Sequence, residues 1–327
     1  MRILFALLFL TQSIICLSQP AVRVIFDTDI GPDFDDVGAI ALLHTFQDQG
    51  KAKILATISC NAYTETGPTL SVFNTYFKRP EIPIGIVKAQ KPNEACREGW
   101  AQAINKKYPH KLKSNDEALE AVGLYRKILA AQPDNSVTII TVGFFTNLAN
   151  LLASPPDKSS PLNGKDLVTK KVKQVVSMAA GIGADGKSAH EFNVWADAAS
   201  AKKVFAEWPT PMLISGFEIG VKILTGVPLI NNGQIKDSPV KDAYEIALKA
   251  TKKNEKGQCS WDQTAVLVAI AGYSPYFDVK KLNFEIKDDG TNVLIPGEKF
   301  TYLVEKMPTN EVAAAIDAMM MHEPRAK

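Results

Sequence analysis

The sequence predicts an α/β fold with a mostly parallel central sheet and helices on both of its faces. Three observations support this prediction. Short apolar runs alternate along the chain with segments of helical periodicity, the rhythm of strand–helix–strand units. The 327 residues are 46% hydrophobic, which is typical of a globular protein with a large core. Polar residues follow several apolar runs directly, where strands of such a sheet would end.

Strands are expected wherever a short apolar run leads into a polar loop. The predicted strands are 22–26 (VRVIF), 53–59, 82–87, 136–142, 172–178 and 211–215. A hairpin is expected at 283–295, because Asp-Asp-Gly separates two strand-like runs there.

Helices are expected in the segments between and after these strands. The predicted helices are 37–47, 67–78, 115–132, 146–154, 197–207, 240–254, 261–271 and 309–321. Two of them have recognisable start signals: Pro68 lies near the start of 67–78, and acidic residues occupy the first turn of 115–132.

The first eighteen residues have the pattern of a secretory signal peptide. Arg2 precedes the apolar stretch ILFALLFLTQSIICL, and small residues at 16 and 18 suit cleavage before Gln19. This stretch is short for a membrane span. We therefore expect an exported protein, periplasmic or secreted, with no stable membrane insertion after cleavage. The remainder, 19–327, is expected to form a single domain, in which 155–171 is an insertion or a lid.

The charges of the chain are nearly balanced. There are 37 Lys and Arg against 35 Asp and Glu, a formal net charge of +2. A protein that binds nucleic acid usually carries a pronounced basic surface. We therefore expect no nucleic-acid partner.

Five carboxylates occur within ten residues, directly after the first predicted strand. They are Asp27, Asp29, Asp33, Asp35 and Asp36. Like charges this close repel each other, and burying them unpaired costs several kcal/mol each. A hard cation would remove this cost, and Ca²⁺ takes roughly six to eight oxygen ligands. Because no His/Cys cluster has zinc spacing, the sequence predicts a Ca²⁺ site.

Polar segments after three further strands would lie at the same edge of the sheet. Asn61 follows the strand 53–59, Val142 ends the strand 136–142, and the segment 181–193 follows 172–178. In a parallel sheet, ligands bind beyond the carboxyl ends of the strands. Loops far apart in sequence are therefore expected to meet around one site.

The chain resembles the inosine-uridine-type nucleoside hydrolases in four motifs that occur in the same order. They are VIFDTDIGPDFDDVGAIALL (24–43), TVGFFTNLANLL (141–152), HEFNVWADAASAKKVF (190–205) and SWDQTAVLVAI (260–270). The resemblance implies a Rossmann-like parallel-sheet fold and Ca²⁺-dependent hydrolysis of the N-glycosidic bond of a small riboside. It also implies a homodimer or homotetramer, the common assemblies of the family.

The resemblance implies a set of metal ligands. Asp29 would contact Ca²⁺ and act as the base that takes a proton from the attacking water. Asp36 would chelate the ion with both oxygens, and the carbonyl of Val142 and the carboxylate of Asp262 would complete the protein ligands. Asp27 would support this set from behind.

The resemblance also implies substrate contacts. Asp35 and Asn193 would hydrogen-bond the ribose 2′- and 3′-hydroxyls, and Glu191 would reach the 5′ side. Asn61 matches an Asn of the sugar pocket. Asp185 stands where a ribose-binding Asn is common in the family, so it is a candidate with a different side chain.

The sequence departs from the family pattern at two places. Two additional residues separate Asp29 from the pair Asp35 and Asp36, and Asp33 lies between them as an alternative for one of their roles. Trp261 occupies the position of a His that is proposed to protonate the leaving base. Because Trp is not an acid at neutral pH, its ring would stack on a flat leaving group instead.

Two other functions remain open from the sequence. A non-catalytic exported protein could retain the sugar and Ca²⁺ pocket. VIFDTDIG also resembles the loop of haloacid-dehalogenase-like phosphatases, in which Asp27 would be the nucleophile; the motifs at 143–147 and 190–193 have no place in that alternative.

Overall fold

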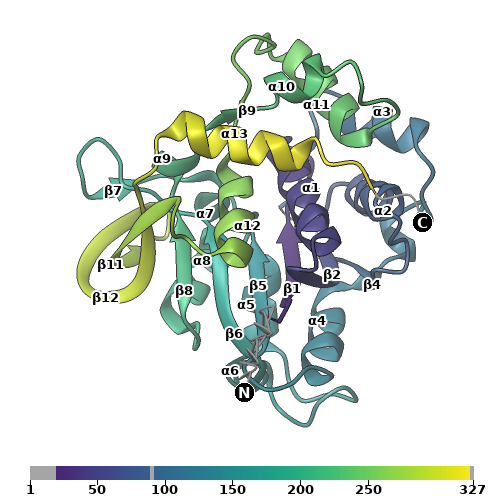
Figure 1. Cartoon of the computed structure of the whole chain (residues 1–327). Coiled ribbons are helices and arrows are strands. Elements are labelled where there is room, and N and C mark those ends of the chain that lie inside the picture. Colours follow the sequence, from purple (N-terminus) through teal and green to yellow (C-terminus); the bar gives the residue numbers. More distant parts are fainter. Residues whose placement is uncertain (1–19, 89–91, 325–327) are drawn as a thin grey trace, which may run out of the picture.

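The computed structural model describes residues 20–88 and 92–324, so the predicted signal peptide lies outside the described residues. Ten strands form one sheet in the order β11-β12-β8-β6-β5-β1-β2-β3-β4, with β7 paired to β12 (Figure 1). The pairs from β12–β8 to β3–β4 are parallel, and β12 is antiparallel to β11 and β7. The predicted, mostly parallel sheet is confirmed.

The strands have the following bounds. They are β1 Val22–Thr28, β2 Ala52–Ser59, β3 Ile84–Ile86, β4 Leu119–Glu120, β5 Val137–Thr141, β6 Val172–Met178, β7 Ser188–Ala189, β8 Met212–Ser215, β11 Phe277–Ile286 and β12 Asn292–Glu305. A separate two-stranded ribbon consists of β9 Leu224–Thr225 and β10 Gln258–Cys259.

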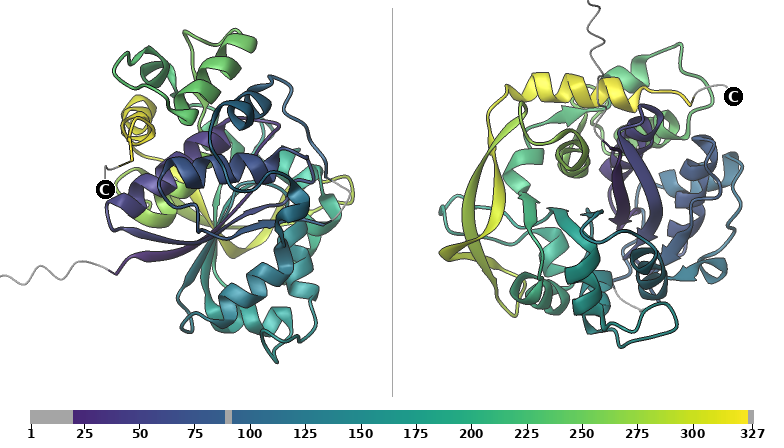
Figure 2. Two further views of the ribbon diagram at one scale, coloured as in Figure 1. Left: turned by 90° about the vertical axis from the view of Figure 1, so that its right-hand side faces the viewer. Right: turned by 60° about the horizontal axis from the view of Figure 1, so that its bottom comes forward.

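Helices cover both faces of the sheet (Figure 2). On one face, the core includes residues of α1 Asp35–Asp48, α2 Thr66–Tyr76, α3 Trp100–Lys107, α10 Val227–Asn231, α11 Pro239–Ala250, α12 Trp261–Ala271 and α13 Thr309–Met320. On the other face, the core includes residues of α4 Ala121–Ala130, α5 Thr146–Ala153, α6 Gly164–Lys171 and α8 Ala198–Glu207. The short helices η1 Asn115–Glu117, α7 Phe192–Trp195 and α9 Phe217–Gly220 lie in connecting loops.

The helices α1 and α12 pack closely in the centre of one face, and this contact positions the site. Gly38 of α1 allows the approach, because a Cβ there would lie 2.4 Å from Nε2 of Gln263 on α12. Both helices are buried along most of their length. Their first turns therefore lie side by side, near the end of β1.

Two sequence-based expectations are wrong. The predicted helix 115–132 begins only at Ala121, because Asn115–Glu117 is a 3-10 turn and Leu119–Glu120 pairs with β3. Asn115 accepts a hydrogen bond from the backbone N of Gly67, and the carboxylate of Glu120 caps α4 instead. These contacts start the helix six residues late.

The segment 155–171 is not a lid. Its second half is α6, which leads into the start of β6, at the end of the sheet away from the carboxylates (Figure 1). The buried Arg126 of α4 holds its first half through an ion pair with Asp157, 3.0 Å between Nε and Oδ2. Of the helices that the structure describes, none is long and apolar enough to cross a membrane.

Candidate active site

A cavity of about 340 Å³ opens at the carboxyl ends of the central strands. Eight of the ten predicted site residues line it: Asp29, Asp35, Asp36, Val142, Glu191, Asn193, Trp261 and Asp262. Asn61 and Asp185 do not. Segments that are separated by more than two hundred residues in sequence thus form one pocket.

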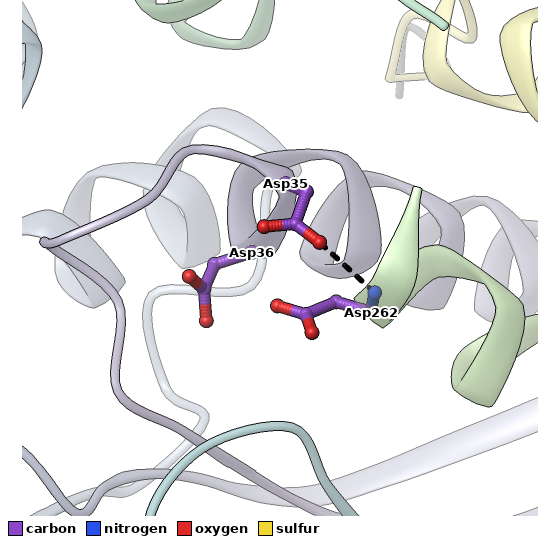
Figure 3. Close-up of side chains that lie close together, drawn as sticks. All are labelled: Asp35, Asp36 and Asp262. Carbon is purple, nitrogen blue, oxygen red and sulfur yellow. Dashed lines mark hydrogen bonds between the residues drawn. The ribbon is translucent and has the colours of Figure 1, made fainter. Parts of the chain in front are cut away.

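Three carboxylates converge at one end of this pocket. One oxygen from each of Asp35, Asp36 and Asp262 lies within 4.8 Å of the others (Figure 3). Asp35 and Asp36 begin α1, and Asp262 is in the first turn of α12, so both helix dipoles favour negative charge here. The backbone N–H of Asp262 donates to Oδ2 of Asp35 at 3.0 Å and fixes the two helix starts relative to each other.

Burial raises the pKa of each of these three carboxyl groups well above its ordinary value, and repulsion from neighbouring aspartates, Asp29 and Asp33 included, raises it further. A cation between them would oppose both effects. The donor set consists only of oxygens, which suits a hard cation such as Ca²⁺ and not a thiolate-preferring metal. The residues present therefore fit a bound metal.

Asp29 extends the cluster from the end of β1. It is 4% exposed, and burial together with the charge of Asp35 raises the pKa of its carboxyl group. Gly143 makes room for it, because a Cβ at that position would lie 2.5 Å from the backbone N of Asp29. The loops after β1 and β5 are thus in contact beneath the pocket.

The carbonyl of Val142 and the side chain of Asn193 are in contact in the pocket lining. Nδ2 of Asn193 donates to the carbonyl oxygens of Val142 and Met178, both at 3.2 Å. Glu191 caps α7: its carboxylate accepts hydrogen bonds from the backbone N–H groups of Asn193, Val194 and Ala180. Burial raises the pKa of Glu191 to about 7. Glu191 therefore both caps α7 and lines the pocket.

The side chain of Asp33 has different partners from that of Asp35. Its Oδ1 accepts hydrogen bonds from the backbone N of Phe34 at 2.7 Å and from Nε2 of Gln258. Asp33 lines the pocket but is not part of the convergent group. The structure thus brings Asp35, and not Asp33, next to Asp36 and Asp262.

The side chain of Asn61 connects two loops through hydrogen bonds and does not line the pocket. Its Nδ2 donates to the carbonyls of Asp29 at 2.8 Å and Glu94 at 2.7 Å. Its Oδ1 accepts from the backbone N–H groups of Tyr63 and Glu94. All the polar atoms of this amide are used within the protein, so a direct sugar contact does not fit this arrangement.

Asp185 also lies away from the pocket. Its carboxylate is exposed and closes a local turn, accepting from the backbone N–H groups of Lys187 at 2.8 Å and Ser188 at 2.9 Å. The Ser188 hydroxyl also donates to this carboxylate, at 2.6 Å, and this bond together with the two backbone bonds lowers the pKa of Asp185 to about 2. Sequence order placed it near Glu191, but the turn directs its side chain to solvent.

Asp27 supports the site from below. It is fully buried, and its carboxylate accepts hydrogen bonds from the Tyr125 hydroxyl at 2.7 Å and from Nδ2 of Asn147. It is not among the residues that line the pocket, so it is poorly placed to act as the nucleophile of a phosphatase. This geometry gives no support to the phosphatase alternative.

Aromatic side chains form another wall of the pocket. The ring of Trp261 stacks on Phe217, with centroids 5.3 Å apart and planes at 27°, and its Nε1–H donates to the Phe217 carbonyl at 3.0 Å. The Phe217 side chain is 44% exposed, and Phe192 lines the same pocket. Sequence reasoning missed both phenylalanines, although Phe217 closely follows the predicted strand 211–215.

Glu94, Arg97 and Glu98 line the pocket from the loop between β3 and α3. Sequence reasoning missed these three residues as well. The general rule that sites follow strand ends applies to this loop, but no motif singled it out. Arg97 is the one cationic side chain among the pocket-lining residues that the structure describes.

Several solved structures share this fold. The purine-preferring ribonucleoside hydrolase from Gardnerella vaginalis is 15% identical, with a TM-score of 0.69, and the match covers 91% of this chain and 99% of that one. An inosine-guanosine nucleoside hydrolase is 19% identical, with a TM-score of 0.68, and the match covers 92% of this chain and 99% of that one. The type III effector protein XopQ, solved with adenosine diphosphate ribose, is 14% identical, with a TM-score of 0.71, and the match covers 93% of this chain and 94% of that one. No curated protein matches the chain.

The fold and the acidic pocket define a hydrolase that acts on N-glycosyl bonds. A family model, inosine-uridine preferring nucleoside hydrolase, matches residues 24–323. The chain therefore belongs to the inosine-uridine preferring nucleoside hydrolase family, and the low identities to the solved structures make it a divergent member. The resemblance seen in the four sequence motifs is confirmed.

Proposed function

We propose that the protein hydrolyses the N-glycosidic bond of a purine or pyrimidine riboside, with Ca²⁺ as its cofactor, and releases ribose. The convergence of Asp35 and Asp262, 227 residues apart, next to Asp36 is the observation that carries this proposal. Such a concentration of buried carboxylates suits a hard cation. The names of similar structures, which include purine-preferring and inosine-guanosine hydrolases, support a nucleoside as the substrate.

The carboxylates of Asp29, Asp36 and Asp262 and the carbonyl of Val142 would hold the ion. When bound, Ca²⁺ would neutralise the acids and orient the ribose diol. Asp29 would take a proton from the water that attacks the anomeric carbon. Because cleavage passes through an oxocarbenium-like sugar, the carboxylates below the ring would stabilise its developing positive charge.

The sugar and the leaving group would occupy different parts of the pocket. Asp35 and Asn193 would bind the 2′- and 3′-hydroxyls, and Glu191, which lines the same pocket, would reach the 5′ side. The ring of Trp261, fixed by its hydrogen bond to Phe217, offers a flat apolar surface to the leaving base. A planar base is therefore the leaving group that this wall favours.

The decisive experiment measures free ribose released by the purified protein from a panel of ribonucleosides. Activity should disappear with a chelator and return with added Ca²⁺. Asp185→Asn is the matched control, because this carboxylate is exposed and bonded within its own turn. Ribose binding without turnover of any riboside at saturating Ca²⁺ would instead favour a non-catalytic binding protein.

We also propose that residues 1–18 direct export and are removed. The apolar stretch after Arg2 and the small residues at 16 and 18 support this. N-terminal sequencing of the protein recovered from the periplasm or the medium should begin at Gln19. Recovery of an intact Met1 from the cytoplasm would contradict this proposal.

A further inference from the structure

We propose that Glu98 is the general acid that protonates the leaving group, an inference that rests on the proposed riboside hydrolysis. The departing base needs a proton on its nitrogen, and Trp261 cannot supply one at neutral pH. No histidine, lysine, tyrosine or cysteine is among the described residues that line the pocket. The proton must therefore come from a carboxyl group.

Most of the carboxyl groups in the pocket have other partners. Asp29, Asp35, Asp36 and Asp262 lie at the end where the cation and the sugar diol would bind. Both oxygens of Glu191 accept backbone hydrogen bonds, and Oδ1 of Asp33 accepts two. Asp33 is thus anchored through one oxygen, and the remaining acids of the pocket without such an anchoring bond, in the part of the chain that the structure describes, are Glu94 and Glu98 of the loop 92–98.

Glu98 differs from Glu94 in one respect that matters for acid catalysis. Its Oε2 is buried and has no hydrogen-bond partner among the described residues. A ligand in the pocket could supply the partner that this oxygen lacks. A protonated Oε2 is a donor that awaits an acceptor, and a leaving-group nitrogen in the pocket would be that acceptor.

Buried neighbours flank Glu98 in the chain. Cys96 and Trp100 on either side are buried, and Gly99 between Glu98 and Trp100 adopts φ +76°, which turns the chain into α3. The amide of Asn61 holds the same loop against Asp29, bonding the carbonyls of Asp29 and Glu94 together. The loop that carries Glu98 is thus connected to the backbone of Asp29, the proposed base.

The glycosidic C1′–N bond breaks and its electron pair goes to the base nitrogen, which takes the proton from Oε2 of Glu98. The attacking water forms the new C1′–O bond and gives its proton to Asp29. Exchange with solvent then returns Glu98 to the acid form and Asp29 to the base form.

The test compares two leaving groups in Glu98→Gln. Inosine needs protonation of its base, whereas p-nitrophenyl β-riboside releases a phenolate that is stable without a proton. We expect Glu98→Gln to lower kcat for inosine by about 10²–10³-fold, with KM little changed, and kcat for the nitrophenyl riboside by less than about 3-fold.

Glu94→Gln is the matched control, because it removes an acid from the same loop and should affect both substrates equally. Equal losses on both substrates in Glu98→Gln, or activity on inosine within about 3-fold of the wild type, would overturn the assignment. If the wild type hydrolyses the nitrophenyl riboside, the proposed glycosidase chemistry survives even when the role of Glu98 does not. If the wild type hydrolyses neither, both proposals fail.

Discussion

The two ends of the pocket are built differently. The carboxylate end comes from the first turns of α1 and α12, two helices buried in the core and packed together at Gly38. The other part consists of the loop 92–98, the exposed Phe217 and the partly buried Trp261, which directly precedes Asp262 in α12. The groups that would hold the cation and the sugar are thus part of the core, whereas Glu98 and Phe217, which would lie near the base, are on connecting loops, where sequence can vary more readily.

The largest expected effect is at the core end. Asp262→Asn should lower kcat/KM by roughly 10³-fold, because it removes a proposed ligand and a charge that would stabilise the transition state. It should also abolish the increase in Tm on addition of Ca²⁺, because that increase reflects binding to the folded state. Steady-state kinetics and thermal unfolding with and without Ca²⁺ would measure both. A variant that keeps the Ca²⁺-dependent shift in Tm would place the ion elsewhere.

Substitution of Asn61, which connects the loops that carry Asp29 and Glu94, should have an effect nearly as large. Asn61→Ala removes the amide that bridges the carbonyls of Asp29 and Glu94. We expect a loss of about 10–100-fold in kcat/KM, typical of residues that orient a metal site, and a destabilisation of about 1–3 kcal/mol. Kinetics and urea unfolding would test this. A direct sugar contact would instead raise KM without a change in stability.

A buried carboxyl group away from the pocket provides a comparison for the acidic cluster. Asp317 is buried, and its carboxylate accepts one backbone hydrogen bond, from Gly226 at 2.8 Å. Burial raises its pKa to about 6, from 3.8. The folded state therefore holds this proton more tightly than the unfolded state, so stability is lost as pH rises from about 4 to about 6.

Asp317→Asn should remove that loss. We expect the variant to gain about 1–2 kcal/mol over the wild type at pH 8 and nothing at pH 4, independent of Ca²⁺. Urea unfolding at the two pH values would measure the difference. A gain that disappears on addition of Ca²⁺ would contradict the assumption that Asp317 lies outside the metal site.

The smallest expected effect is at the aromatic wall. Trp261→Ala should raise KM for a purine riboside about tenfold and change kcat little, because base stacking contributes about 1–3 kcal/mol to binding. Trp261→Phe should recover most of the affinity. A large loss in kcat would mean that Trp261 positions Asp262 and not the base.

Local patterns in the sequence predicted much of this protein. The bounds of α12 and β6 match the predicted 261–271 and 172–178, because the patterns that specify them lie within each segment. The acids after β1 indicated a cation site, because carboxylates that lie so close together in the sequence must repel each other. Two residues assigned to sugar contacts by resemblance, Asn61 and Asp185, do not line the pocket.

The reason for those two differences is physical. An amide or carboxylate can bond to any donor within reach, and its neighbours in sequence do not reveal which one it meets. Asn61 meets the carbonyl of Glu94, 33 residues away, whereas Asp185 meets the N–H groups of its own turn. The hydrogen-bond partners of such side chains are determined only when the loops pack together.

The sequence by itself determined the order of strands and helices, the concentration of acids after β1, and the family, because each depends on neighbouring residues or on motifs in order. Only the tertiary structure decided that Asp35 and not Asp33 joins Asp262, that Trp261 stacks on Phe217, and that Glu98 enters the pocket with an unpaired oxygen. These pairings depend on how closely α1 packs on α12 and on where the loop 92–98 is anchored. Both are set by contacts between segments far apart in the chain.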